Sequence, residues 1–113
     1  MSQPTPRQYR NLSLEGGRLT ALRELPFHDR ELETACRDLL EAPVGELVID
    51  LSGIGYLAST QIGALVAASQ RAIERRRHLR IIISPNLVKF LERLKMDGLI
   101  AYEVAGAPPP AED

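Results

Sequence analysis

The chain has 113 residues, of which 44% are hydrophobic and 26% are charged, and its formal net charge is −1 at pH 7. This length and composition are typical of one globular domain and exclude a chain that is disordered throughout. A charge so close to zero gives no long-range field that would attract nucleic acid or an anionic membrane. The amino terminus lacks the apolar core of a secretory signal, and no stretch approaches the roughly 20 apolar residues that cross a bilayer. Since Cys36 is also the single cysteine, we expect a cytoplasmic protein without internal disulfides.

The first third of the chain predicts a β-hairpin followed by a helix. Apolar and polar residues alternate over residues 9–14 and 18–22, on either side of a Gly-Gly pair, as in two antiparallel strands joined by a tight turn. Over residues 30–41 the apolar positions recur at the spacing of an amphipathic helix. Asp29 precedes this segment and is a plausible cap of the helix.

The rest of the chain repeats a unit of one strand and one helix. Residues 46–51 are nearly continuously apolar, which predicts a strand covered on both faces of a parallel sheet. A helical repeat of apolar residues follows from Ile62 and closes in three arginines at 75–77. Residues 79–83 predict the next strand, and another helix follows it and ends at Gly98.

A Ser-Pro-Asn sequence opens this last helix, with Ser84 as its expected cap. Residues 99–104 predict a short final strand. The order β-β-α-β-α-β-α-β indicates an α/β fold with a largely parallel, mixed sheet and helices packed on it. We assign residues 1–7 to a flexible N-terminal segment, 8–104 to the domain and 105–113 to a proline-rich flexible tail.

Three turns between a strand and the next helix, at residues 27–29, 52–60 and 84–86, should lie together at the carboxyl edge of the sheet. Open α/β folds bind ligands at this edge. The middle turn ends in two adjacent hydroxyls, Ser59 and Thr60, and we expect one of them to cap the following helix. A phosphoryl group there would face unpaired amides and the positive end of the helix dipole.

The segment Asp-Leu-Ser-Gly-Ile-Gly-Tyr-Leu-Ala-Ser-Thr-Gln-Ile-Gly-Ala-Leu, residues 50–65, resembles the central motif of STAS domains. This family contains the bacterial anti-sigma factor antagonists, and its domains also occur in sulfate transporter tails and in a bacterial lipid-transport complex. The family pattern reads D-L-S-x-V-x-x-[ILM]-D-[ST]-[SA]-G-L-x-x-L. Residues 79–86 and 87–99 resemble the family's fourth strand and closing helix, so the resemblance covers about residues 8–104.

The resemblance implies a STAS fold and a regulatory module without catalysis of its own. In antagonists the serine after the motif aspartate is phosphorylated by a partner kinase of the histidine-kinase-like ATPase type, which is itself the anti-sigma factor, and a phosphatase reverses this. The matching serine is Ser59, and Thr60 is the alternative acceptor. Unmodified antagonist binds the kinase and the phosphorylated form releases it. Two positions depart from the pattern, because Ala58 replaces the aspartate and Gln61 replaces a glycine.

The turns supply the residues of the expected partner surface. These are Phe27, Asp29, Tyr56, Ala58, Ser59, Thr60, Gln61, Ile62, Ser84 and Asn86. For Phe27 and Tyr56, packing in the core is the alternative to a role as interface anchors. Asp50 and Ser52 belong to the structural motif, with Asp50 expected to accept from amides of the turn.

Two other functions stay open besides the phosphorylation switch. One is a scaffold subunit that is not phosphorylated, in a signalling assembly or beside a lipid transporter, and Ala58 favours it. The other is a sensor of small ligands at the same edge. We expect no enzyme, cofactor or metal, because no hydrolase or P-loop motif is present and His28, His78 and Cys36 lack ligand spacing. We expect the arginines at 75–77 to face water at a helix end and to bind no nucleic acid, and we expect no insertion into membranes.

Overall fold

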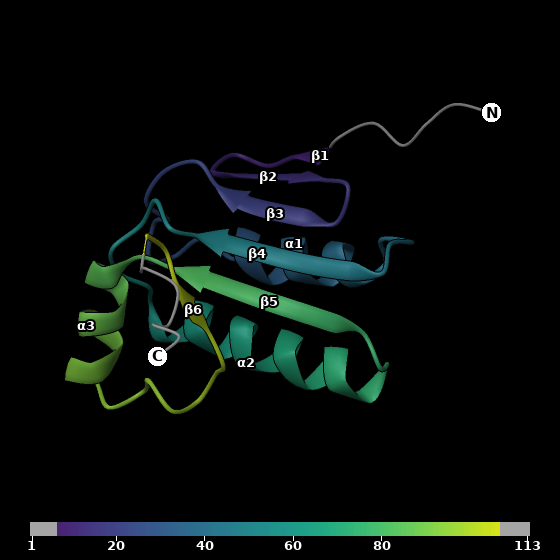
Figure 1. The fold of residues 1–113 in the computed structure, drawn as a ribbon. Helices are drawn as coiled ribbons and strands as arrows, with labels where there is room; N and C mark the ends of the chain where they lie inside the picture. Colours follow the sequence, from purple (N-terminus) through teal and green to yellow (C-terminus); the bar gives the residue numbers. More distant parts are fainter. Residues whose placement is uncertain (1–6, 107–113) are drawn as a thin grey trace.

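A computed structural model describes residues 7–106 and shows a single sheet with helices packed against it (Figure 1). Within these residues the elements are β1 (Arg7–Gln8), β2 (Leu12–Glu15), β3 (Arg18–Ala21), α1 (Glu31–Leu40), β4 (Glu46–Leu51), α2 (Ser59–Glu74), β5 (His78–Ile83), α3 (Pro85–Arg93) and β6 (Glu103–Val104). The predicted order is therefore confirmed, and the short strand β1 is added before it. Of the flexible ends that we expected, residues 1–6 and 107–113 lie outside the described part.

The strands follow one another across the sheet in chain order, from β1 to β6. The pairs β1–β2 and β2–β3 are antiparallel, whereas β3, β4, β5 and β6 run parallel. Each helical crossover moves one strand along in the same direction, and right-handed crossovers of this kind place their helices on one face. Figure 1 shows α1 and α2 side by side on that face, and α3 beyond the carboxyl ends of β4 and β5.

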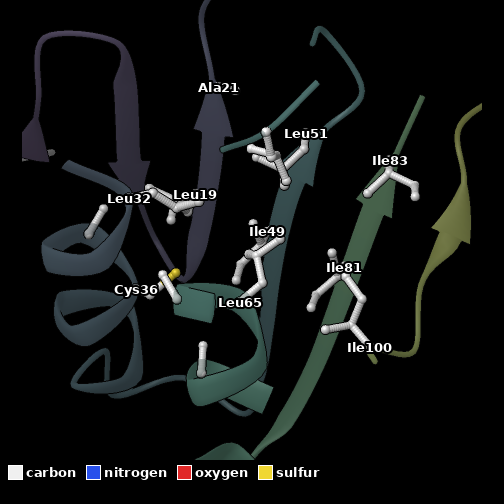
Figure 2. Packing of buried hydrophobic residues seen from close by; sticks show 14 of the residues in the cluster. Leu19, Ala21, Leu32, Cys36, Ile49, Leu51, Leu65, Ile81, Ile83 and Ile100 are labelled. Atoms are coloured by element: carbon white, nitrogen blue, oxygen red, sulfur yellow. The ribbon is translucent and has the colours of Figure 1, made fainter. Parts of the chain in front are cut away.

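The core lies between the sheet and these helices. Figure 2 shows side chains from β3, β4 and β5 meeting side chains from α1 and α2. Each of these residues is at most 3% exposed: Leu19, Ile49, Leu51, Ile81, Ile83, Leu32, Cys36 and Leu65. Burial raises the pKa of the Cys36 thiol to about 12 because the thiolate would lose its hydration.

The opposite face of the sheet carries charged side chains, and in the described part of the chain no helix lies on it. The expectation that β4 is covered on both faces is therefore wrong. Val48 is 7% exposed although it points to this face, since it lies in register between Arg18 and Arg80. Long arginine side chains can cover apolar surface with their stems while the charged heads stay in water.

These arginines bind acidic side chains on neighbouring strands. Arg18 Nη2 lies 2.5 Å from Asp50 Oδ2, and Arg80 Nε lies 2.7 Å from Glu103 Oε2. Arg80 also approaches Glu46 at 3.6 Å. These ion pairs join β3 to β4, and β5 to both β4 and β6. Neighbouring strands are therefore linked on this face by charged side chains.

One arginine of the run at 75–77 has a structural role instead of facing water as expected. Arg77 is half-buried, and its guanidinium donates to the carbonyl oxygens of Leu40 at 2.9 Å, Ala42 at 2.7 Å and Val44 at 2.5 Å. Carbonyls at the end of a helix have no partner within the helix. Arg77 therefore closes the carboxyl end of α1 and fixes the segment that leads into β4.

Candidate functional site

Three turns meet at the carboxyl edge of the parallel strands, between β3 and α1, β4 and α2, and β5 and α3 (Figure 1). The middle turn is held from both sides. The Glu24 carboxylate accepts from the Gly55 N–H at 2.9 Å, and the Ser84 hydroxyl donates to the Ile54 carbonyl at 2.6 Å. The backbone that leads to Ser59 is thus fixed by its neighbours before any partner arrives.

The start of α2 differs from the expectation in its capping residue. We expected Ser59 or Thr60 to be the N-cap, and this is wrong: Ala58 is the N-cap, with an extended backbone at φ −72° and ψ 158°. The N–H groups of Gln61 and Ile62 donate to the Ala58 carbonyl at 2.9 and 3.0 Å. Ser59 is consequently the first residue of the helix.

Ser59 and Thr60 are both exposed. Among residues 7–106, neither their hydroxyls nor their backbone N–H groups have a hydrogen-bond partner. Unpaired N–H groups in the first turn of a helix attract anions, and the helix dipole adds to this effect. Both side chains are therefore open to an incoming active centre, with free amides beside them.

Gln61 lies inside the protein, although we expected it at the partner surface. It is 2% exposed, its Oε1 accepts from the Ala58 N–H at 2.8 Å, and its Nε2 donates to the Pro26 carbonyl at 2.8 Å. A glutamine at the third helical position commonly reaches back to the amide of the N-cap in this way. Gln61 thus supplies one of the two bonds of a capping box, and the methyl group of Ala58 cannot supply the other.

The other expected surface residues divide by burial. Ile62 is 1% exposed and belongs to the core, and Ser84 is 8% exposed. Ser84 caps α3 as predicted, because its hydroxyl accepts from the Leu87 N–H at 3.0 Å. Asn86 is exposed beside Gly55. Gln61, Ile62 and Ser84 are therefore buried residues that support this edge and are not exposed to a partner.

Asp29 contributes to the amino end of α1 although Arg30 is the N-cap of that helix. Asp29 Oδ1 accepts from the Glu31 N–H at 2.8 Å, and its Oδ2 accepts from Asn11 Nδ2 at 3.2 Å. The side chain is half-buried. Asp29 therefore ties the turn before α1 to the start of β2.

Asp50 and Ser52 form a local turn motif at the end of β4. Asp50 Oδ1 accepts from the Ser52 N–H at 3.0 Å and from its hydroxyl at 2.6 Å, while Oδ2 faces Arg18. Partial burial would raise the pKa of Asp50, but the hydrogen bonds from Ser52 and the charge of Arg18 outweigh it and hold this pKa below its ordinary value. The charged side chain of Asp50 thus stabilises the turn.

Three aromatic rings form a row across this edge. The rings of Phe27 and Tyr56 have centroids 5.2 Å apart at an angle of 63°, and those of Tyr56 and Phe90 are 6.3 Å apart at 62°. The chain has only two phenylalanines and three tyrosines, so most of its aromatic residues gather here. Such edge-to-face contacts are favourable for ring quadrupoles.

Phe90 is the member of this aromatic row that sequence reasoning missed. It lies on α3 three residues after Leu87, at the edge of the stripe that Leu87 and Leu91 bury, and it packs half-buried against the core. A large aromatic residue at the edge of the apolar stripe of an amphipathic helix is the signal that could have found it. Phe27 remains 56% exposed in the row, so more than half of its surface is available to a partner.

Between residues 7 and 106, no group of three or more His, Cys, Asp or Glu side chains could hold a metal ion. In the same part of the chain, none of the helices has the length and apolar character that crossing a membrane requires.

Comparison with protein-family models gives a match over residues 11–101 to the family described as Mlab, STAS domain. The matched range includes all three turns and the aromatic row. No curated protein and no solved structure gives a significant match.

Proposed function

Because the chain belongs to the STAS domain family, whose members bind partner proteins, we propose that it is a non-catalytic regulator of the anti-sigma factor antagonist type. It acts in the cytoplasm and docks a serine/threonine kinase of the histidine-kinase-like ATPase type. The docking edge consists of the three turns with their aromatic row. Phosphorylation of Ser59, or alternatively of Thr60, releases the kinase, and a phosphatase restores binding.

The observation that carries the proposal is the accessible hydroxyl of Ser59. It stands on the first turn of α2, exposed and without a protein partner in the described residues. A kinase must bring its γ-phosphate within bonding distance of the acceptor oxygen, so an acceptor held under other side chains could not react. The bonds of Glu24 and Ser84 to the middle turn fix the backbone that leads to this residue.

The aromatic row supports a protein partner at the same edge. Tyr56 lies in the turn that leads to Ser59, and Phe27 offers more than half of its surface. Aromatic side chains are enriched among the residues that dominate binding energy at protein interfaces. Phe27 is therefore the anchor; its ring contacts Tyr56, which in turn contacts Phe90.

The switch follows from charge. A phosphoryl group adds about −1.5 to −2 charges at pH 7. The free amides of Ser59 and Thr60 stabilise this charge in the isolated protein, and Ala58 places no carboxylate against it. In the complex the same dianion would be buried against a surface shaped for a neutral hydroxyl, which favours dissociation.

Two variants of one residue test the switch. Ser59→Asp should weaken the complex with the kinase at least tenfold, about 1.4 kcal/mol, whereas Ser59→Ala should bind as the unmodified protein does. Isothermal titration with each candidate kinase measures both. Equal affinities of the two variants would end the mechanism at Ser59, and the same pair of variants at Thr60 then tests the alternative acceptor.

A constitutive scaffold is the second candidate, in a signalling assembly or beside a lipid transporter, and the capping arrangement favours it. Ala58 stands where the family pattern has an aspartate, and Gln61 secures the turn from inside without any modification. Intact-mass spectrometry after incubation with ATP and a candidate kinase separates the two functions. A switch gains about 80 Da, one phosphate, whereas a scaffold gains nothing.

A further inference from the structure

A groove with a volume of about 280 Å³ lies between α1 and α2. Arg30, Glu33 and Arg37 line it on the side of α1, and Thr60 and Arg71 line it on the side of α2. Thr60 and Arg71 are eleven residues apart in α2, which corresponds to about 16 Å along the helix, or about five residues of extended peptide. The end at Thr60 is next to Ser59, so the groove begins at the docking edge.

The charge of this groove is opposite to that of the chain. Its lining includes three arginines and one glutamate, whereas the whole chain has a net charge of −1. Glu33 is shared between two arginines, because its carboxylate lies 3.4 Å from Arg30 and 3.8 Å from Arg37. In the described part of the chain Arg71 makes no ion pair. The groove therefore holds an excess of positive charge.

The residues on the floor of the groove have small side chains or none. Gly63, Ala64 and Ala67 line it from α2, and a side chain built on Gly63 would meet nothing within 4 Å. A backbone or a short side chain can therefore approach α2 closely at this point. No aromatic residue is among the lining residues, so the groove lacks the platform on which nucleobases stack.

We propose that the groove binds an acidic peptide segment of a partner protein. Carboxylates of the segment pair with Arg37 and Arg71 on the two rims, and its backbone lies over Gly63. Alternate side chains of an extended chain lie on one face about 7 Å apart, so a run of alternating acidic residues offers carboxylates to both Arg30 and Arg37, which are seven residues, or about 10 Å, apart along α1. The inference rests on the proposed function, because the segment would extend from the partner docked at Ser59.

The test uses the full chain and a fluorescein-labelled decapeptide of alternating glutamate and alanine, with fluorescence anisotropy as the readout. We expect the peptide to bind, and we expect Arg37→Glu and Arg71→Glu each to weaken it at least tenfold. Arg76→Glu is the matched control, because it changes the net charge equally at the far end of α2, outside the groove. The control should leave the affinity unchanged.

Gly63→Leu provides a second test that leaves the charges alone. Leucine has a higher helix propensity than glycine, so the variant should stay folded by circular dichroism. Its side chain should fill the groove and abolish binding of the peptide. Retained binding in this variant would overturn the placement of the peptide over Gly63.

Other outcomes would also sink the inference. These are a glutamine-alanine peptide that binds as tightly as the acidic one, an equal loss with Arg76→Glu, and an oligonucleotide of the same charge that competes as well. Because no kinase is present, the result is separate from the switch. A kinase complex that responds to Ser59→Asp while the peptide fails to bind would leave the proposed function standing and remove this inference.

Discussion

Gln61 Nε2 lies 2.8 Å from the carbonyl oxygen of Pro26, and this bond ties the first turn of α2 to the turn after β3. The same side chain accepts from the Ala58 N–H. Gln61→Met keeps the length of the side chain but leaves both backbone groups without their partner in a buried place. We expect the free energy of unfolding to fall by about 2 kcal/mol, the usual cost of buried unpaired polar groups, as measured by urea denaturation.

Gln70→Met is the matched control for this prediction, because Gln70 lies on the same helix and is exposed. It should change the free energy of unfolding by less than about 0.5 kcal/mol. If both variants were equally stable, the inward glutamine would not hold the docking edge together.

The order of elements could be predicted because it depends on patterns that are local in the sequence. The alternation in the hairpin and the helical repeats report directly which residues face a core. The cap at Ser84 was also predictable, since its Ser-Pro signature lies within one turn of the helix that it starts.

Two of the errors concern contacts between segments far apart in the chain. The run Leu-Val-Ile in β4 suggested two covered faces, but Val48 is shielded in register with Arg18 and Arg80, which lie on other strands. The inward turn of Gln61 depends likewise on Pro26. Spacing along the chain shows that a residue needs a partner but not which distant group supplies it.

Phe27→Ala should weaken binding to the kinase at least tenfold, about 1.4 kcal/mol, with a much smaller effect on folding. Phe27 is 56% exposed, and within residues 7–106 its ring contacts that of Tyr56 alone. Loss of such a contact changes the free energy of unfolding by about 1 kcal/mol. Surface plasmon resonance of the complex and thermal denaturation of the free protein measure the two effects separately.

Ile73→Ala is the control for an exposed apolar side chain elsewhere, because Ile73 is 76% exposed on α2. It should leave the affinity for the kinase unchanged. A partner that loses more affinity with Ile73→Ala than with Phe27→Ala would dock on a different face from the one proposed.

Arg77→Lys should destabilise the fold although it preserves the charge. The guanidinium donates to three carbonyl oxygens, from Leu40, Ala42 and Val44. A lysine ammonium cannot reproduce this planar set of donors. We expect a loss of about 2 kcal/mol in the free energy of unfolding, whereas Arg76→Lys, at the exposed neighbour, should be neutral. Comparable losses in both would mean that the carbonyls find other partners.

Asp50→Asn should lower the free energy of unfolding at neutral pH, and this difference from the unchanged protein should disappear in acid. The folded state binds the charged form of Asp50 through Ser52 and Arg18, which keeps its pKa below the ordinary value. The unfolded chain therefore takes up a proton first as the pH falls, so the stabilisation is complete above about pH 4 and is lost as the pH drops through the lower folded pKa.

At pH 7 we expect Asp50→Asn to be less stable than the unchanged protein by about 1 kcal/mol. Chemical denaturation between pH 7 and pH 2.5 should show the difference between the two proteins constant down to about pH 4 and shrinking below it. Asp97→Asn serves as the control at an exposed carboxyl. A gap that stayed constant down to pH 2.5 would show that Asp50 acts in the turn through its shape alone, and a gap that widened toward low pH would have the wrong sign for a carboxylate held in its charged form.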